Sequence, residues 1–331
     1  ALMANTTGCQ GIAIGYEALC SNTTANNNNA VGYRTLRYNT TGTNNTGLGN
    51  GALHDNTTGS YSTAVGSSAL SVNTTGSNQS FGTFSMAKNT TGTLNNAHGY
   101  AAMEENTTGC YNTAMGHASM NKNTTANFNT AFGSHALMSN TTGGYNVSVG
   151  ACSLKANTTA SYNTATGVYA LNATTTGACN TAHGYAALIA NTTGSTNTAF
   201  GYKAVYCSTT VGGNMGMGIC ALYNNTTGSA NTAVGAFNTL KSNTTGAGHT
   251  ALGMYALQGN TTGNYNTASG YMALTTNSTG SWNVAHGREA LRMNSTSSYN
   301  TAVGGKALKC NTTAGGNQAF GYTALYNNTT G

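Results

Sequence analysis

The sequence contains no proline and very little charge. Proline is absent from all 331 residues, and Asp, Glu, Lys and Arg together make up 5% of the chain, against roughly a quarter in an ordinary soluble protein. Because every residue keeps its backbone N–H, unbroken backbone hydrogen-bond ladders are possible. Simple disorder is not indicated, since disordered chains usually combine low hydrophobicity with high net charge or many prolines.

The low charge and the lack of long apolar runs exclude two classes of partner. A net charge of +6 over the whole chain is too small to form the dense Lys and Arg surface that neutralises phosphates. Binding to nucleic acid is therefore not expected. No run of 18 apolar residues is present, so no membrane insertion is expected. No signal peptide is recognised at the start. The chain opens and closes part-way through a repeat, and we interpret residues 1–331 as a single continuous solenoid, a segment of a longer repetitive chain.

The sequence consists almost entirely of one repeated motif. The pattern NTTGxxNTAxGxxALxx recurs every 17 residues from Asn5 onward, with one unit a residue short (from Asn73) and one a residue long (from Asn225). Its positions are numbered below as columns 1 to 17, counted from Asn5. Such a period is too short for helical-pair repeats or propeller blades, whose units run to about 34 residues or more.

The period fits one turn of a β-solenoid. We therefore predict an all-β fold, a parallel β-solenoid (a β-roll or β-helix) of about 19 coils with a 17-residue repeat, each coil stacked about 4.8 Å from the next. Column 15 is the one dependable large apolar site and is usually Leu, columns 9 and 14 are mostly Ala, and column 11 is Gly. The expected interior is a thin stack of Leu and Ala between two closely spaced sheets, with Gly where the coil turns or backbones crowd.

Charge follows the same columns. Every Lys, Arg, Asp and Glu falls in column 12, 13, 16 or 17, and columns 1 to 11 carry none. One edge of the coil is therefore expected to be solvated in the ordinary way. The remainder is an uncharged lattice of Asn, Thr, Gly and Ala.

The asparagines of column 1 allow two interpretations. Asn-Thr-Thr is an N-glycosylation acceptor in a secreted protein, but stacked asparagines can instead hydrogen-bond to one another as a ladder. Asn is almost as frequent in column 7, where Asn-Thr-Ala is no acceptor, which favours ladders as the main reason for the pattern. The candidate glycosylation sites are Asn5, Asn22, Asn39, Asn56, Asn73, Asn89, Asn106, Asn123, Asn140, Asn157, Asn172, Asn191, Asn225, Asn243, Asn260, Asn277, Asn294, Asn311 and Asn328. The predicted structural ladder of column 7 comprises Asn112, Asn129, Asn163, Asn180, Asn197, Asn231, Asn266 and Asn300.

The sequence offers no constellation typical of an enzyme. His98, His183 and His286 share column 10 but lie at least five coils apart, too far to bind one metal ion. Phosphate-loop and calcium-repeat motifs are absent. The eight cysteines form no framework of adjacent pairs and are expected to be small fillers or free thiols. We therefore expect no enzymatic activity, no metal and no cofactor.

One resemblance is carried by NTAVG followed by AL, as in residues 231–235 and 300–308. These segments resemble the head repeats of trimeric autotransporter adhesins of the YadA type and similar β-solenoid repeats of tail-fibre and surface proteins. The resemblance implies a parallel β-roll, often trimeric, displayed outside the cell for adhesion. The usual repeat of that family is shorter and lacks the NTTG phrase, and no binding residue is transferred.

The sequence thus predicts an extracellular or cell-surface fibre protein, structural or adhesive, that associates with itself coaxially or laterally. Glycans or a host or cell surface are further candidate partners, and the Tyr-rich columns 6 and 12 are either packing or an adhesive stripe. The alternative function is ice binding by ladders of Thr and Asn, with Thr in columns 2, 3 and 8 forming the grid.

Overall fold

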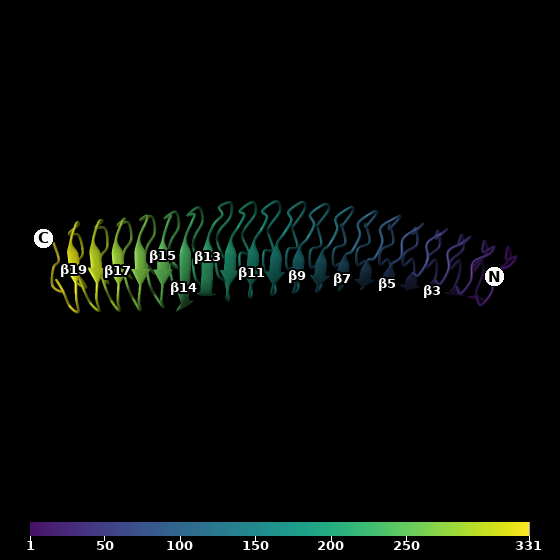
Figure 1. Cartoon of the computed structure of the whole chain (residues 1–331), viewed down its shortest axis with the longest axis horizontal. Coiled ribbons are helices and arrows are strands. Elements are labelled where there is room, and N and C mark those ends of the chain that lie inside the picture. Colours follow the sequence, from purple (N-terminus) through teal and green to yellow (C-terminus); the bar gives the residue numbers. More distant parts are fainter. Residues whose placement is uncertain (331) are drawn as a thin grey trace. The chain divides into compact units, whose positions relative to one another are not determined.

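The computed structural model describes residues 1–330, and its only regular secondary structure there is β-strand. The chain divides into two compact units, the first Ala1–Asn163 and the second from Thr164 onward. In both, the chain winds as a parallel β-solenoid with one strand in each turn (Figure 1). The predicted fold class is confirmed, while the single continuous solenoid stays a prediction.

The strands follow one another at the repeat spacing. The first unit contains β1 (Ile12–Ile14), β2 (Asn29–Val31), β3 (Thr46–Leu48), β4 (Thr63–Val65), β5 (Gln79–Phe81), β6 (Asn96–His98), β7 (Thr113–Met115), β8 (Thr130–Phe132) and β9 (Val147–Val149). The second unit contains β10 (Thr164–Thr166), β11 (Thr181–His183), β12 (Thr198–Phe200), β13 (Met215–Ile219), β14 (Thr232–Phe237), β15 (Thr250–Leu252), β16 (Thr267–Ser269), β17 (Val284–His286), β18 (Thr301–Val303) and β19 (Gln318–Phe320).

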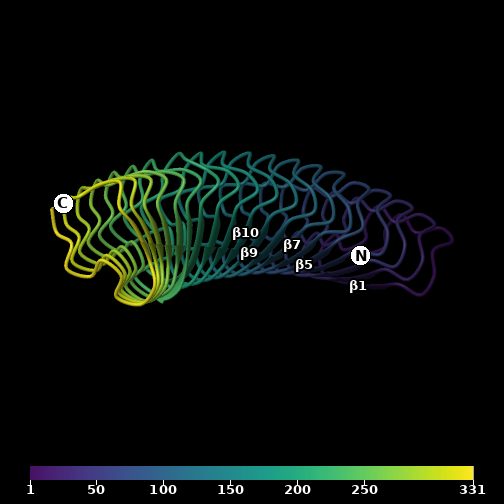
Figure 2. The same cartoon turned by 60° about the vertical axis from the view of Figure 1, so that its left-hand side comes forward.

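Within each unit every strand pairs in parallel with the next, column against column. Ala30 of β2 is the Cα partner of Gly47 in β3, which is in turn the partner of Ala64 in β4. Figure 2 shows the strands of the first unit following one another along one side of the coil. The expectation of two facing sheets is wrong, because the strands of each unit form one sheet from columns 8 to 10 and the other sides of the coil consist of turns.

The interior lies between this sheet and the turn of columns 14 and 15. The middle residue of nearly every strand is small and buried, as Ala64 is, and faces the buried pair of the same coil, Ala69 and Leu70. The predicted core of Leu and Ala is confirmed in this form. Met takes the place of Leu in three consecutive coils, at Met86, Met103 and Met120, and is equally buried.

The turns depend on backbone conformations that non-glycine residues seldom adopt. The backbone angle φ is positive in columns 6, 13 and 15 of nearly every coil, although Tyr, Leu and charged residues occupy these columns. Examples are Tyr145 at 59°, His135 at 57° and Leu137 at 53°. Each such residue costs on the order of 1–2 kcal/mol. Hydrogen bonds between coils hold these turns, since the N–H of Leu137 donates to Ser153 O at 3.0 Å and that of His135 to His117 O at 2.9 Å.

Column 11 is where glycine is required. Gly116 has φ 135°, and a Cβ atom there would lie 2.6 Å from the carbonyl oxygen of Gly133 in the next coil. In column 4 the backbones of neighbouring coils also approach closely, but φ is not positive there. Some coils have alanine in this column, as at Ala126 and Ala160. The two recurring glycines therefore have different causes, a turn in column 11 and close approach of backbones in column 4.

The two irregular units leave the sheet in register. The short unit lacks its column 6 residue, so that Gly76 and Ser77 lead directly to Asn78, and Thr63 still pairs with Gln79. The long unit has its extra residue after Gly235, where β14 is extended and the pairing shifts between Met217 and Ile219 of β13. Length changes are thus absorbed in the turns.

Candidate functional site

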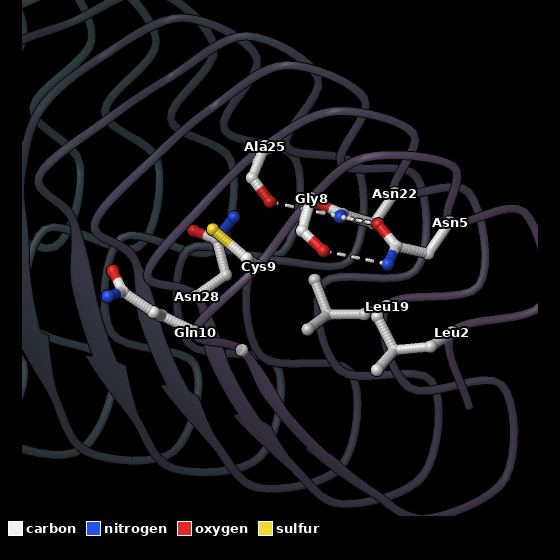
Figure 3. Close-up of a pocket in the computed structure, with 10 residues that line it drawn as sticks. Leu2, Asn5, Gly8, Cys9, Gln10, Leu19, Asn22, Ala25 and Asn28 are labelled. Atoms are coloured by element: carbon white, nitrogen blue, oxygen red, sulfur yellow. Dashed lines mark hydrogen bonds between the residues drawn. The ribbon is translucent and has the colours of Figure 1, made fainter.

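The asparagines of column 1 form a buried ladder. The Nδ2 of Asn39 donates to Oδ1 of Asn22 in the preceding coil at 3.1 Å and to Gly42 O in its own turn at 2.9 Å. The same pair of bonds recurs along both units. Figure 3 shows the arrangement at Asn5 and Asn22, with Leu2 and Leu19 one above the other beside them.

A second ladder follows column 7. The Nδ2 of Asn129 donates to Gly143 O at 2.9 Å, and its Oδ1 accepts the backbone N–H of Asn146 in the next coil at 2.9 Å. Gly143 O also accepts from Asn140 of column 1 at 2.9 Å. The carbonyl of Gly143 therefore receives two amide donors, one from each ladder, which satisfies both its lone pairs in the interior.

The prediction of an asparagine ladder is confirmed, and all eight of the residues predicted for it in column 7 are fully buried within the coil. The sequence analysis missed further members, although the column position identifies them. These are Asn28, Asn45, Asn78, Asn95, Asn146, Asn214, Asn283 and Asn317, with Ser62 and His249 in the same column.

Most candidate glycosylation sites lie in the interior. Only Asn5 is exposed, and Asn172 and Asn328 are partly exposed; the remaining column 1 asparagines are buried. A glycan is attached through Nδ2, which in this ladder is enclosed and donates both its protons. The burial argues against glycans at those positions in the folded coil, and glycosylation of Asn5, Asn172 and Asn328 stays a prediction.

The column 1 ladder is interrupted in the second unit at Ser208. The Oδ1 of Asn191 and the Oγ of Ser208 are both buried without a hydrogen-bond partner. The serine side chain is too short to span the gap that asparagine fills elsewhere. A buried polar atom left unpaired costs about 1–3 kcal/mol.

We therefore expect Ser208→Asn to stabilise the chain. The new Nδ2 would donate to Asn191 Oδ1 and the new Oδ1 would accept from Asn225, which raises the free energy of unfolding by about 1–3 kcal/mol in urea denaturation. Ser208→Ala is the matched control: it removes the unpaired hydroxyl but leaves Asn191 Oδ1 without a donor, so it should recover only part of this gain. A destabilised Ser208→Asn variant would show that the gap is too narrow for the amide.

The first and third residues of each strand, columns 8 and 10, point outward and form what we call the strand face. Column 8 is mostly Thr, and column 10 holds side chains of very different size, among them Val65, His98, Phe132 and Ser269. The Thr of column 8 lies on this face, whereas those of columns 2 and 3 lie in a turn. The expected ice-binding grid of columns 2, 3 and 8 is therefore divided between two sides of the coil, and ice binding itself stays a prediction.

The aromatic side chains of column 6 stack along the coil. In the first unit Tyr111, Phe128, Tyr145 and Tyr162 form a continuous series with ring centroids 4.9, 5.0 and 5.2 Å apart. A shallow groove of about 260 Å³ is lined by Phe128, Tyr145 and Tyr162 together with Thr125 and Thr142. Because the ring faces cover one another, the inner rings offer only their edges to a ligand. This supports packing as the main role of the column.

One charged side chain is buried, although the charged columns are expected to be exposed to solvent. Glu289 is 5% exposed, and Lys309 Nζ lies 2.6 Å from its Oε2 and Arg288 Nη2 3.2 Å from its Oε1. The hydrogen bond from Lys309 lowers the pKa of the Glu289 carboxyl and outweighs the opposing effect of burial. The position is column 13, where the turn folds the side chain back against the coil.

Reactive groups do not converge in residues 1–330. No group of three His, Cys, Asp or Glu side chains there could hold a metal ion. No disulfide joins the cysteines of the described residues. The described part of the chain has no helix able to span a membrane.

Comparison with known proteins adds no family to this geometry. No family model matches the chain, and neither a curated protein nor a solved structure matches it. The likeness to adhesin head repeats rests on the short NTAVG and AL segments alone. The chain is a repetitive parallel β-solenoid with two buried asparagine ladders.

Proposed function

We propose that this chain is a structural segment of an extracellular fibre. The observation that carries the proposal is the recurrence of one bonding pattern: the column 1 amide bonds at Asn39, Asn106 and Asn277 are the same, coil after coil. A catalytic or ligand-binding protein concentrates unlike groups at one place. Uniform coils suit mechanical continuity, because each coil is stabilised by its neighbours and more coils extend the same structure.

The uncharged lattice supports the same proposal. A long surface free of Lys, Arg, Asp and Glu favours association with like surfaces, since like charges would oppose it. The resemblance of the NTAVG segments to surface adhesin repeats supports a place outside the cell. Adhesion to a host or cell surface is the finer form of the proposal and has no binding residue assigned to it.

The proposal is tested by electron microscopy and fibre diffraction of the purified chain. We expect filaments that grow in number with protein concentration and a reflection at about 4.8 Å along the fibre axis. Isolated particles at every concentration would overturn the proposal. Thermal hysteresis by such isolated particles would favour ice binding instead.

A further inference from the structure

Column 10 of the strand face is exposed or partly exposed and mostly apolar in both units. In column 10 the exposed fraction is 60% for Ile14, 47% for Leu48 and 51% for Phe200, and Met115 and Leu252 are also exposed. Parallel pairing in register places column 10 of one coil beside that of the next, so that Leu48 lies between Val31 and Val65. Soluble monomers rarely expose a contiguous apolar stripe of this kind.

The strand face also carries no charged residue. None of the residues of β1–β9 or β10–β19 is Lys, Arg, Asp or Glu, and the charged side chains all lie in the turns of columns 12, 13, 16 and 17. The only titratable side chains on it are His98 in the first unit and His183 and His286 in the second. An occupant that relies on salt bridges has nothing to pair with here.

The spacing of the face restricts its occupant further. Side chains project from it in rows that repeat at the strand spacing of about 4.8 Å. Rings stack along these rows, as Phe81 does on His98 at 4.4 Å and His183 on Phe200 at 4.6 Å. A partner that interdigitates over many coils must be uncharged and must repeat at the same spacing.

We infer that the strand face is an interface between two copies of this chain, packed sheet against sheet. A second copy presents the same uncharged face, with a mostly apolar row in column 10, a Thr-rich row in column 8 and the same row spacing, and two such sheets pack about 10 Å apart with interdigitating side chains. The inference rests on the proposed fibre function and deepens it, because it assigns lateral association to one side of the coil. The charged turns then stay at the solvent edge of the pair.

The test adds four lysines to the strand face of the full chain, two in each unit: Met115→Lys, Val149→Lys, Phe200→Lys and Leu252→Lys. All four side chains point outward and are exposed, so the coil itself tolerates the change. The matched control adds four lysines at exposed positions outside the face, Ser67→Lys, Leu94→Lys, Val168→Lys and Met293→Lys. Circular dichroism establishes that both variants are folded.

Sedimentation velocity from about 1 to 100 μM, a range typical of modest protein affinities, should show paired wild-type and control chains and a monomeric strand-face variant. A wild-type chain that stays monomeric, or a strand-face variant that pairs like the control, would overturn the inference. Binding of the monomeric wild type to neutral phosphatidylcholine vesicles, lost in the strand-face variant, would assign the face to lipid instead.

Electron microscopy separates this result from the proposed function. If the strand-face variant forms filaments like the wild type, association is coaxial: the inference fails and the fibre proposal stands. If the wild type pairs in solution but never forms filaments, the interface stands and the fibre proposal fails.

Discussion

Replacing Asn129 by alanine is expected to destabilise the first unit by about 2–5 kcal/mol. The side chain donates to Gly143 O and accepts the N–H of Asn146, both at 2.9 Å and both in the interior. Alanine leaves the Asn146 N–H without its acceptor and removes one of two donors from the Gly143 carbonyl. Water cannot replace the lost partners, because Asn129 is fully buried.

The loss is expected to be local, so the measurement must resolve single coils. In repeat proteins each coil is stabilised mainly by its neighbours. Hydrogen exchange should therefore show faster exchange at Asn146 and Thr130 than in coils farther along the same unit. Asn50→Ala is the control, since Asn50 is exposed in column 12, and a change there should stay within about 0.5 kcal/mol. An unchanged exchange rate at Asn146 would refute the role given to the ladder.

The coil and its ladders could be predicted from the sequence because both follow directly from the repeat. A strict period places each residue beside its counterpart, and identical amides stacked at strand spacing bond to one another. The comparison of column 7 with column 1 identified the ladder, since Asn129 lies in no glycosylation motif. The same argument fails where a residue differs from the usual residue of its column, as Ser208 does in column 1.

The single sheet could not be predicted in this way, because the conformations of the turns run against residue preference. Tyr145 and Leu137 adopt positive φ, which Leu and Tyr rarely do. Only the hydrogen bonds from the neighbouring coils hold them there. The burial of column 1 was likewise not evident, because an Asn-Thr-Thr motif has the same letters whether Asn56 faces solvent or, as here, the interior.

His249 makes the stability of the second unit depend on pH. It occupies column 7 in place of asparagine and is fully buried. Its backbone N–H donates to Asn231 Oδ1 at 3.0 Å, and its ring Nδ1 accepts the N–H of Asn266 at 3.2 Å. The ring proton is therefore assigned to Nε2, on the side of Gly263 O, so that the neutral imidazole replaces both functions of the amide.

Protonation of His249 breaks this arrangement. A second proton on Nδ1 would face the N–H of Asn266, and the charge would be buried. Burial lowers the pKa of His249 to about 4, against the raising effect of its hydrogen bond with the backbone of Gly263. The unfolded chain takes up the proton near pH 6.5.

Between pH 6.5 and about 4 the unfolded chain therefore holds a proton that the folded chain lacks. The contribution of His249 to the free energy of unfolding is constant above this window and decreases as the pH falls through it. At the lower end of the window this contribution is smaller by about 3 kcal/mol. The free energy of opening at Asn266, measured by hydrogen exchange from pH 7.5 to 4, should follow this curve.

His249→Asn is the matched control, because it restores the residue that fills column 7 in most other coils and carries no titratable group. The variant should keep the bonds to Asn231 and Asn266 and lose the pH dependence of opening at Asn266 in this window. Every other side chain is the same in the two proteins, so the difference between the two curves isolates the histidine. If the curves are parallel down to pH 4, His249 takes up its proton as readily in the folded coil as in the unfolded chain, and the ladder at this position accommodates the charge.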